Sequence, residues 1–167
     1  GSPSRDWVRS LFEDREGNRW VGMNSGLNRL RDGRFTIYGR AEGLPSDEPL
    51  TVHQDPAGRV WVGYHGGGLV SLPGSGMENA ARHLHSYTTG NGLASSEIFS
   101  IRDNPDGGLL LSTRGGLNVM APRGLTTLVP KDALSRRLVF DALKDRKGTL
   151  WVAAPGGVYQ ISRGVWH

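Results

Sequence analysis

One nine-residue segment recurs along the chain at a nearly fixed interval, and it constrains the fold more than any other feature. At 14–22 the segment reads Asp-Arg-Glu-Gly-Asn-Arg-Trp-Val-Gly, and closely similar copies follow at 55–63 and 145–153. A degraded copy lies between them and consists of Asp103, Asp106-Gly107 and, at the tryptophan position, Leu110. This position recurs after 41, 49 and 41 residues, which is a period of 41 with one insertion. Such a period indicates a chain built from stacked copies of one supersecondary unit.

The same landmarks surround every copy in the same order. A glycine and an apolar residue follow the segment, as Gly26-Leu27, Gly68-Leu69, Gly116-Leu117 and Gly157-Val158. A further stretch precedes the next copy, as Gly43-Leu44-Pro45-Ser46, Gly92-Leu93-Ala94-Ser95 and, more weakly, Ala133-Leu134-Ser135. Landmarks that keep the same order and register from copy to copy indicate a true internal repeat.

Within one period the residues predict four short strands joined by tight turns. In the first copy the strands A to D are expected at 8–13, 19–23, 27–31 and 35–38. The A–B turn Asp14-x-x-Gly17 and the C–D turn Asp32-Gly33 carry residues that such turns require. Connections this short allow only an antiparallel meander, and about forty residues per meander is the size of one β-propeller blade.

The chain is therefore predicted to be all-β, with four four-stranded antiparallel blades that are part of a larger propeller or of an oligomeric ring. The blades are expected at about 7–42, 48–91, 97–130 and 138–167, after an expression scar or linker at 1–6. A closed four-blade ring and two chains pairing into an eight-bladed ring are alternatives, since an open array would leave apolar blade faces in water. Self-association is expected for the same reason.

The repeated tryptophans are interpreted as packing residues. A lone blade has two apolar faces that neighbours must cover, and a large ring on strand B can fill the gap between blades. Sugar stacking is the alternative for these rings. The residues assigned to the structural blade motif are Asp14, Gly17, Trp20, Asp55, Gly58, Trp61, Asp145, Gly148 and Trp151.

These segments resemble the two-component regulator propeller repeat, whose motif runs Asp-x-x-Gly-x-[Leu/Ile/Arg]-Trp-Val-Gly-x-x-x-Gly-Leu. The match is nearly complete at 14–27, and the copy at 55–69 has one extra residue. The copy at 145–158 has two alanines after Trp-Val, and the copy at 103–117 lacks the tryptophan and has Ser112 for glycine. The resemblance covers essentially the whole chain.

The resemblance implies a ligand-sensing module of a bacterial receptor. Such repeats usually form seven-bladed propellers in the periplasmic part of inner-membrane receptors with a histidine-kinase or diguanylate-cyclase output. Related sensors recognise oligosaccharides, and these propellers bind and dimerise but are not enzymes. The expected function is therefore extracytoplasmic sensing, with a periplasmic location, a membrane-anchored parent protein and no cofactor.

Composition and charge further restrict the kinds of site and partner expected for this chain. The chain has no cysteine, and no apolar run long enough to span a membrane or signal peptide is recognised. The net charge of +4 and the pI of about 9.8 raise the possibility of nucleic-acid binding. The basic residues alternate with acidic and apolar ones, so a solvated surface is favoured and no nucleic-acid partner is expected. The His83-Leu84-His85 pair lacks a third metal ligand nearby, so no metal site is predicted.

Ligand binding is expected where loops converge at one end of the propeller. The D–A and B–C loops share one end, and polar residues there suit sugar hydroxyls or anions. The candidates are Asn24, Tyr64, His65, Arg114, Glu48, Glu97 and Arg136. His53 stands out on strand A, at the position assigned to Phe12, Ile101 and Leu143 in the other copies, and is interpreted as a core histidine.

Three functions follow from these expectations. The first is a sensor that binds a small ligand, an oligosaccharide or an anion, and signals through dimer geometry. The second is a protein-interaction or structural propeller without a small ligand. The third is a propeller enzyme such as a lyase, although the chain has no Gly-x-Ser-x-Gly or His-Glu-x-x-His motif.

Overall fold

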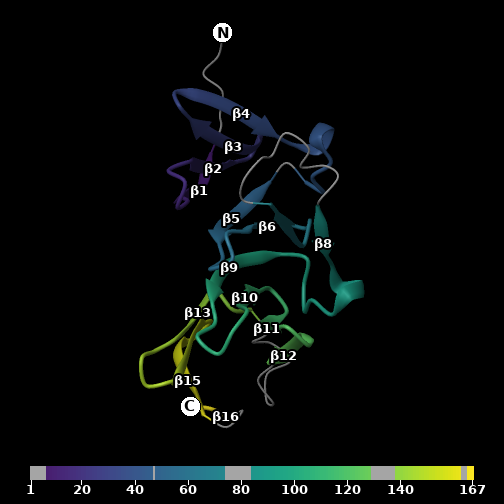
Figure 1. Cartoon of the computed structure of the whole chain (residues 1–167). Coiled ribbons are helices and arrows are strands. Elements are labelled where there is room, and N and C mark those ends of the chain that lie inside the picture. The colour runs from purple at the N-terminus through teal and green to yellow at the C-terminus, as the bar shows by residue number, and fades with distance from the viewer. Residues whose placement is uncertain (1–6, 47, 74–83, 129–137, 163–164) are drawn as a thin grey trace.

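Four antiparallel sheets follow one another along an open arc (Figure 1). The computed structural model describes residues 7–46, 48–73, 84–128, 138–162 and 165–167. Each sheet has four strands whose spatial order is their sequence order. This confirms the prediction of an all-β chain with four four-stranded antiparallel blades.

The blades are numbered in chain order. Blade 1 contains β1 (Val8–Glu13), β2 (Arg19–Met23), β3 (Gly26–Arg31) and β4 (Arg34–Tyr38). Blade 2 contains β5 (Pro49–Gln54), β6 (Val60–Tyr64), β7 (Leu69–Leu72) and β8 (His85–Tyr87). Blade 3 contains β9 (Ile98–Asp103), β10 (Leu109–Thr113), β11 (Gly116–Ala121) and β12 (Gly124–Leu128). Blade 4 contains β13 (Asp141–Lys144), β14 (Leu150–Ala154), β15 (Gly157–Ser162) and β16 (Val165–Trp166). Short 3₁₀ turns, η1 (Arg40–Glu42) and η3 (Thr89–Asn91), lead out of blades 1 and 2.

Strand A is the innermost strand of every blade. β1 contacts β5, β5 contacts β9, and β9 contacts β13, so these four strands line the inside of the arc. Blades 1 and 4 lie at opposite ends of the molecule in Figure 1. The described residues therefore do not form a closed four-blade ring, and the alternatives of a larger propeller and of an oligomeric ring stay open.

The A–B turn explains why an aspartate and a tryptophan recur six residues apart. The indole Nε1 of Trp20 donates a hydrogen bond to Asp14 Oδ2 at 2.7 Å, and Trp61 donates to Asp55 Oδ2 at 2.8 Å. Trp151 repeats the contact with Asp145 Oδ2 at 2.9 Å. The aspartate thus begins the turn and also accepts the hydrogen bond of the one polar atom of the tryptophan ring.

The degraded third copy is shifted by one residue from the predicted alignment. Asn104, and not Asp103, occupies the turn position, since its backbone N–H donates to the carbonyl of Gly108 as that of Asp14 does to Asn18. Leu110 has no indole N–H, so the turn residue of this copy has no tryptophan to accept a hydrogen bond from. Asp103 is instead the last residue of β9 and lies 2.9 Å from His53 Nε2 through its Oδ1.

The same shift corrects the strand A alignment. Trp20 pairs with Phe12 across β1–β2, Trp61 pairs with His53, and Leu110 pairs with Arg102. Arg102 and not Ile101 is therefore the counterpart of His53. His53 is part-buried and reaches blade 3, which makes it an inter-blade contact on the inner strand.

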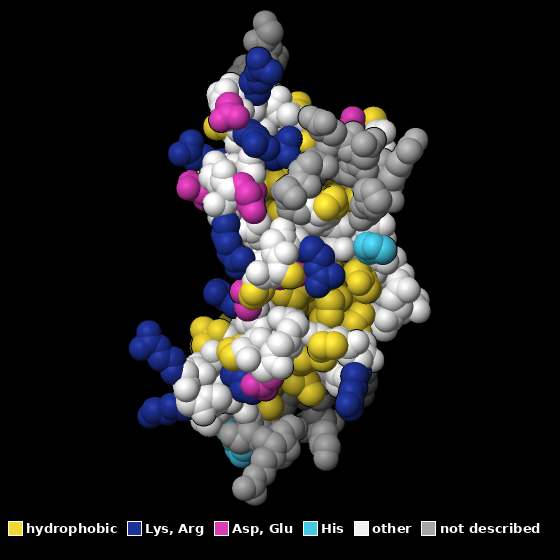
Figure 2. Space-filling view, viewed as in Figure 1, with side chains coloured by type: hydrophobic (Ala, Val, Ile, Leu, Met, Phe, Trp, Pro, Cys, Tyr) yellow, Lys and Arg dark blue, Asp and Glu magenta, His cyan; other side chains and the backbone are white. Residues whose placement is uncertain are grey.

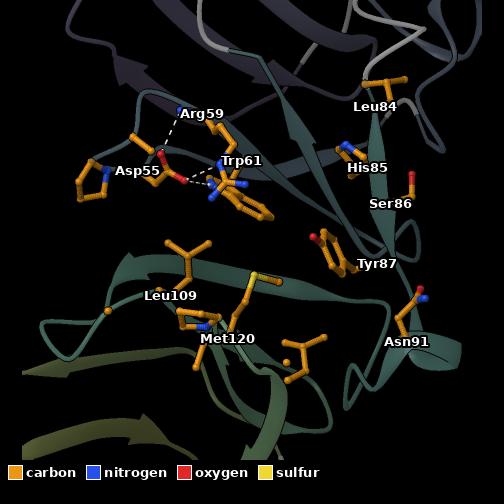
Figure 3. A pocket seen from close by; sticks show the side chains of 18 residues that line it. Asp55, Arg59, Trp61, Leu84, His85, Ser86, Tyr87, Asn91, Leu109 and Met120 are labelled. Carbon is orange, nitrogen blue, oxygen red and sulfur yellow. Dashed lines mark hydrogen bonds and ion pairs between the residues drawn. The ribbon is translucent and has the colours of Figure 1, made fainter.

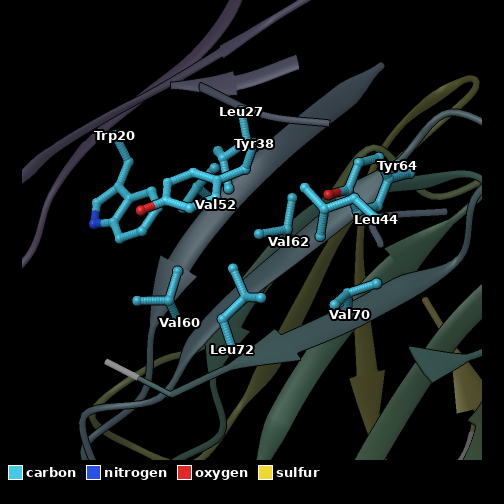
Figure 4. Close-up of a cluster of buried hydrophobic side chains, with 10 residues drawn as sticks. All are labelled: Trp20, Leu27, Tyr38, Leu44, Val52, Val60, Val62, Tyr64, Val70 and Leu72. Carbon is cyan, nitrogen blue, oxygen red and sulfur yellow. The ribbon is translucent and has the colours of Figure 1, made fainter. Parts of the chain in front are cut away.

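Three apolar clusters form the core, and each fills the space between two consecutive blades. Figure 4 shows the first, in which Trp20 and Leu27 of blade 1 meet Val52, Val62 and other residues of blade 2. Trp20 is fully buried and Trp61 is 2% exposed, which confirms their packing role and leaves neither ring a free face for a sugar. Trp151 is 37% exposed, because no described blade follows blade 4.

Candidate functional site

Four of the seven predicted site residues meet at the end where the D–A and B–C loops lie. His65 Nδ1 lies 3.4 Å from Glu48 Oε2, and its Nε2 lies 3.2 Å from Glu97 Oε1. Arg114 Nη1 donates to the other oxygen of Glu97 at 3.2 Å. These residues, Glu48, His65, Glu97 and Arg114, form a continuous row, the loop-end cluster.

The backbone positions each pair in the same way. The N–H of His65 donates to the carbonyl of Glu48 at 3.0 Å, and that of Arg114 donates to Glu97 at 3.2 Å. These bonds continue the β5–β6 and β9–β10 ladders by one step beyond the strands. Each glutamate therefore stands directly across from the first residue of a B–C loop.

A serine two residues before each glutamate holds the loop that presents it. Ser46 Oγ accepts the N–H of Glu48 at 3.2 Å, and Ser95 Oγ accepts the N–H of Glu97 at 3.1 Å. Such serine turns fix the chain just before strand A. Neither serine was among the predicted site residues, although the repeated Gly-Leu-x-Ser-x-Glu stretch was the signal that could have identified them.

The loop-end cluster crosses the boundary between two blades. Glu48 and His65 belong to blade 2, whereas Glu97 and Arg114 belong to blade 3. The backbone reinforces the crossing, because the N–H of Gly68 in the blade 2 B–C loop donates to the carbonyl of Ser96 at 2.8 Å. The side-chain contact that crosses the boundary is His65–Glu97, so a ligand that displaces it would change how blade 2 meets blade 3.

The charges of the cluster indicate which ligands it suits. Two carboxylates face one guanidinium and one imidazole, and Glu97 is the most buried of the four, with 15% of its side chain exposed. A free anion would meet two carboxylates and an arginine that is already paired. Alternating donors and acceptors on an exposed surface instead match the hydroxyl groups of a neutral ligand.

The remaining candidates differ in position. Asn24 Oδ1 accepts the N–H of Trp7 at 2.9 Å and so closes the corresponding end of blade 1. Tyr64 is fully buried in the core between blades 1 and 2, so the expectation that it faces a ligand is wrong. Tyr64 is the last residue of β6, and its ring lies beside Leu44 in this core (Figure 4). Arg136 lies outside the described residues.

Metal binding and membrane spanning find no support in the described part of the chain. No group of three or more His, Asp or Glu side chains in the described ranges could hold a metal ion. No helix among the same residues has the length and apolarity needed to cross a membrane. Figure 2 shows Lys and Arg side chains spread over the visible face and not gathered in one patch.

Comparison with solved structures places the fold among β-propellers. The chain superimposes on the extracellular domains of two "putative hybrid two component systems" from B. thetaiotaomicron. For BT4673 the TM-score is 0.77 at 22% identity, and the match covers 93% of this chain and 23% of the other. For BT3049 the TM-score is 0.81 at 19% identity, with 98% of this chain and 24% of the other covered. These neighbours are consistent with the resemblance to the two-component regulator propeller repeat.

A propeller enzyme shares the same fold. Catalytically inactive virginiamycin B lyase from Staphylococcus aureus superimposes on 100% of this chain with a TM-score of 0.73 at 13% identity, and 56% of that chain is covered. No protein-family model and no curated protein matches the sequence. The chain spans about a quarter of the length of the two-component neighbours, and at these identities the likeness is one of fold.

Proposed function

We propose that this chain is a ligand-sensing part of an extracytoplasmic β-propeller in a bacterial signalling receptor. The observation that carries the proposal is the loop-end cluster, which joins two blades through exposed, alternately charged side chains. The fold likeness to extracellular domains of two-component systems supports a periplasmic location and a membrane-anchored parent protein. The site acts by binding and carries no catalytic role in this proposal.

The ligand class is a neutral oligosaccharide in preference to an anion. Glu48 and Glu97 accept hydrogen bonds from sugar hydroxyls, and Arg114 donates to them. A hydroxyl that takes the place of the His65–Glu97 contact loosens the link between blade 2 and blade 3. The change in blade 2–blade 3 geometry then passes to a dimer partner, whose contact we place at the exposed blade faces.

A thermal-shift screen with neutral and acidic oligosaccharides tests the proposal. A true ligand at 100 times its Kd stabilises the protein by about 2.7 kcal/mol, which raises Tm by several degrees at roughly 2–4 °C per kcal/mol. Glu97→Gln and Arg114→Gln should abolish the shift. Arg31→Gln is the matched control, since Arg31 is exposed at the other end of a blade and forms its ion pair with the neighbouring Asp32.

The outcomes separate the competing functions. Stabilisation by neutral sugars, lost in Glu97→Gln but kept in Arg31→Gln, supports the proposal. Stabilisation by uronates alone would reassign the ligand to an anion, and no shift with any sugar would contradict carbohydrate sensing. If no sugar shifts Tm and the chain captures a protein partner in a pull-down, the result would support a protein-interaction propeller.

The likeness in fold to virginiamycin B lyase makes a propeller lyase the second function to test. A lyase would convert a bound ligand into a product of different mass, and His65→Ala would abolish that conversion. A sensor returns the ligand unchanged from a long incubation. Mass spectrometry of the ligand after incubation therefore distinguishes the two functions.

A further inference from the structure

A cleft of about 870 Å³ lies between blades 2 and 3, away from the loop-end cluster. It runs along β8 from the A–B turn of blade 2 at Asp55 to Asn91 in η3. In Figure 3, Trp61 and Tyr87 lie on one side of the space and Leu109 and Met120 lie on the other. A cleft of this size holds a small organic ligand.

The blade 1–blade 2 boundary offers a comparison for the aromatic side of the cleft. At both boundaries a tryptophan on strand B meets a tyrosine on strand D, with ring centroids 6.2 Å apart for Trp20 and Tyr38 and 5.9 Å apart for Trp61 and Tyr87. In blade 1 the guanidinium of Arg29 covers both rings, at 5.8 Å from the centroid of Trp20 and 5.7 Å from that of Tyr38. Arg29 therefore fills the space beside the aromatic pair.

Ser71 replaces this arginine in blade 2. Arg29 is the cross-strand partner of Trp20, and Ser71 is the cross-strand partner of Trp61. Serine is too short to cover the two rings. On the other side of Ser71 the sheet continues to His85, which lines the cleft. In blade 2 the guanidinium of Arg59, just before β6, lies over the Trp61 ring instead, so Trp61 is 2% exposed and Tyr87 is the part-buried ring of the pair.

Blade 3 supplies an apolar wall opposite this pair. Leu109, Met120 and Leu125 belong to the same apolar cluster as Trp61, and all three line the cleft. Figure 2 shows hydrophobic side chains gathered on this face of the molecule, below an exposed histidine. The thioether of a methionine packs well against an aromatic ring, so this wall suits a flat aromatic group.

One arginine and one aspartate carry the charge at the mouth of the cleft. Arg59 lies on its rim with 57% of its side chain exposed and its guanidinium 5.3 Å from the centroid of the Trp61 ring. Asp55 is the only carboxylate among the described lining residues, and it is buried. Its oxygens already accept bonds from Trp61 Nε1 and from Arg59. The bond to Asp55 uses Arg59 Nε, so an entering ligand meets the exposed remainder of this guanidinium.

We propose that this cleft binds an aromatic carboxylate or sulfonate, with the ring between the blades and the anionic group beside Arg59. The apolar wall stabilises the ring by removing it from water. Arg59 stabilises the anion through charge-assisted hydrogen bonds. The site is independent of the loop-end cluster and uses none of its residues.

Two fluorescent probes that differ in charge test the proposal on the intact chain. 8-Anilinonaphthalene-1-sulfonate is anionic, and N-phenyl-1-naphthylamine is its neutral relative. We expect both to bind saturably at one site per chain. Arg59→Gln should weaken the sulfonate about tenfold, the loss of one charge-assisted contact, and leave the neutral probe within about twofold.

Ser71→Arg tests the site itself, since it adds a long side chain between the cleft-lining residues Trp61 and His85 on the neighbouring strands. It should weaken both probes at least about tenfold. Leu125→Trp fills the cleft from the opposite wall and should act in the same way, so the test does not depend on one variant folding. Tm of each variant, measured without probe, identifies those that fold.

The exposed face of blade 4 is the competing site for apolar probes. Val158→Gln on that face should leave the saturable binding unchanged. Loss of saturable binding in Val158→Gln, with normal binding in folded Ser71→Arg and Leu125→Trp, would overturn the proposal. Equal weakening of both probes by Arg59→Gln would overturn the anionic part. A failed sugar screen leaves this test unaffected.

Discussion

Equivalent apolar positions are buried on the internal blade faces of this molecule and exposed on its two terminal faces. Leu11 of blade 1 is 73% exposed, whereas its counterparts Val52, Ile101 and Ala142 are 7%, 5% and 3% exposed. At the other end Val158 is 68% exposed, whereas Leu27, Leu69 and Leu117 are fully buried. Each internal blade interface thus joins the face that carries Trp20, Trp61 or Leu110 to the opposite face of the next blade. The two end faces are the unpaired halves of that interface.

The comparison shows that a blade motif alone does not determine burial. Trp61 and Trp151 make the same indole–aspartate bond, yet only Trp61 has a blade packed over it. The turn is therefore a local structure that forms in each blade by itself. Burial of the ring and most of its stabilising effect come from the next blade.

Replacing each tryptophan by alanine gives the largest expected effect. Trp61→Ala leaves a cavity between blades 2 and 3 and should lower the free energy of unfolding by about 3–5 kcal/mol. Trp151→Ala removes a ring that is packed on one side only, and should cost about 1–2 kcal/mol. Urea unfolding followed by circular dichroism measures both. Equal losses would show that blade 4 is covered as fully as blade 2 in solution.

Removing the buried turn carboxylate should have the next largest effect. Asp55→Asn keeps the shape but weakens the bonds to Trp61 and Arg59, and should cost about 1–3 kcal/mol. Asp145→Asn, on the exposed blade, should cost less, because water can replace the lost bonds. The same unfolding experiment compares the pair. A larger loss for Asp145→Asn would contradict the idea that burial sets the strength of this contact.

An aspartate at the blade 3–blade 4 boundary should make that interface acid-sensitive. Burial alone would raise the pKa of Asp141, but hydrogen bonds from Arg102 and Ser100 outweigh it and lower the pKa below its usual value. A carboxyl group whose pKa is lowered in the folded state stabilises the protein above the unfolded value of about 3.9. That contribution is lost as the pH falls through the folded value.

The measurement is Tm between pH 7 and pH 3. Tm should fall below about pH 4 in the wild type, and the fall should be shallower in Asp141→Asn. Asp32→Asn is the control, since this exposed side chain lies in the C–D turn of blade 1 and pairs with Arg31 of the same blade. A profile for Asp141→Asn that matches the wild type would exclude Asp141 as the source.

The regular parts of the fold could be predicted well from the sequence. In blade 1 the predicted strands agree with β1 to β4 to within one residue at each end. This agreement depends on local signals, since the turn residues and the tryptophan spacing occur within each single repeat. The predicted alignment of the third copy was wrong by one residue. Leu110 makes no bond to an aspartate, so no sequence signal distinguished Asn104 from Asp103 as the turn residue.

Features that depend on two blades were harder to predict. Tyr64 was placed on the loop surface because it is the last residue of a strand, and its burial depends on Leu44 and blade 1. The contacts of Glu97 with His65 and Arg114 were not predicted, although each residue was a candidate. The cleft is lined by residues of blades 2 and 3, so no single repeat of the sequence could reveal it.

Charged substitutions on the two end faces should have the smallest effect on stability, within about 0.5 kcal/mol, because the positions are exposed. Leu11→Glu and Val158→Glu should each reduce self-association, measured by size-exclusion chromatography with light scattering. If the faces pair head to tail, each variant keeps one intact face. An equimolar mixture should then recover a heterodimer, since the intact face of one variant fits that of the other. A mixture that stays monomeric would contradict head-to-tail pairing, and a wild-type chain that is itself monomeric would remove self-association altogether.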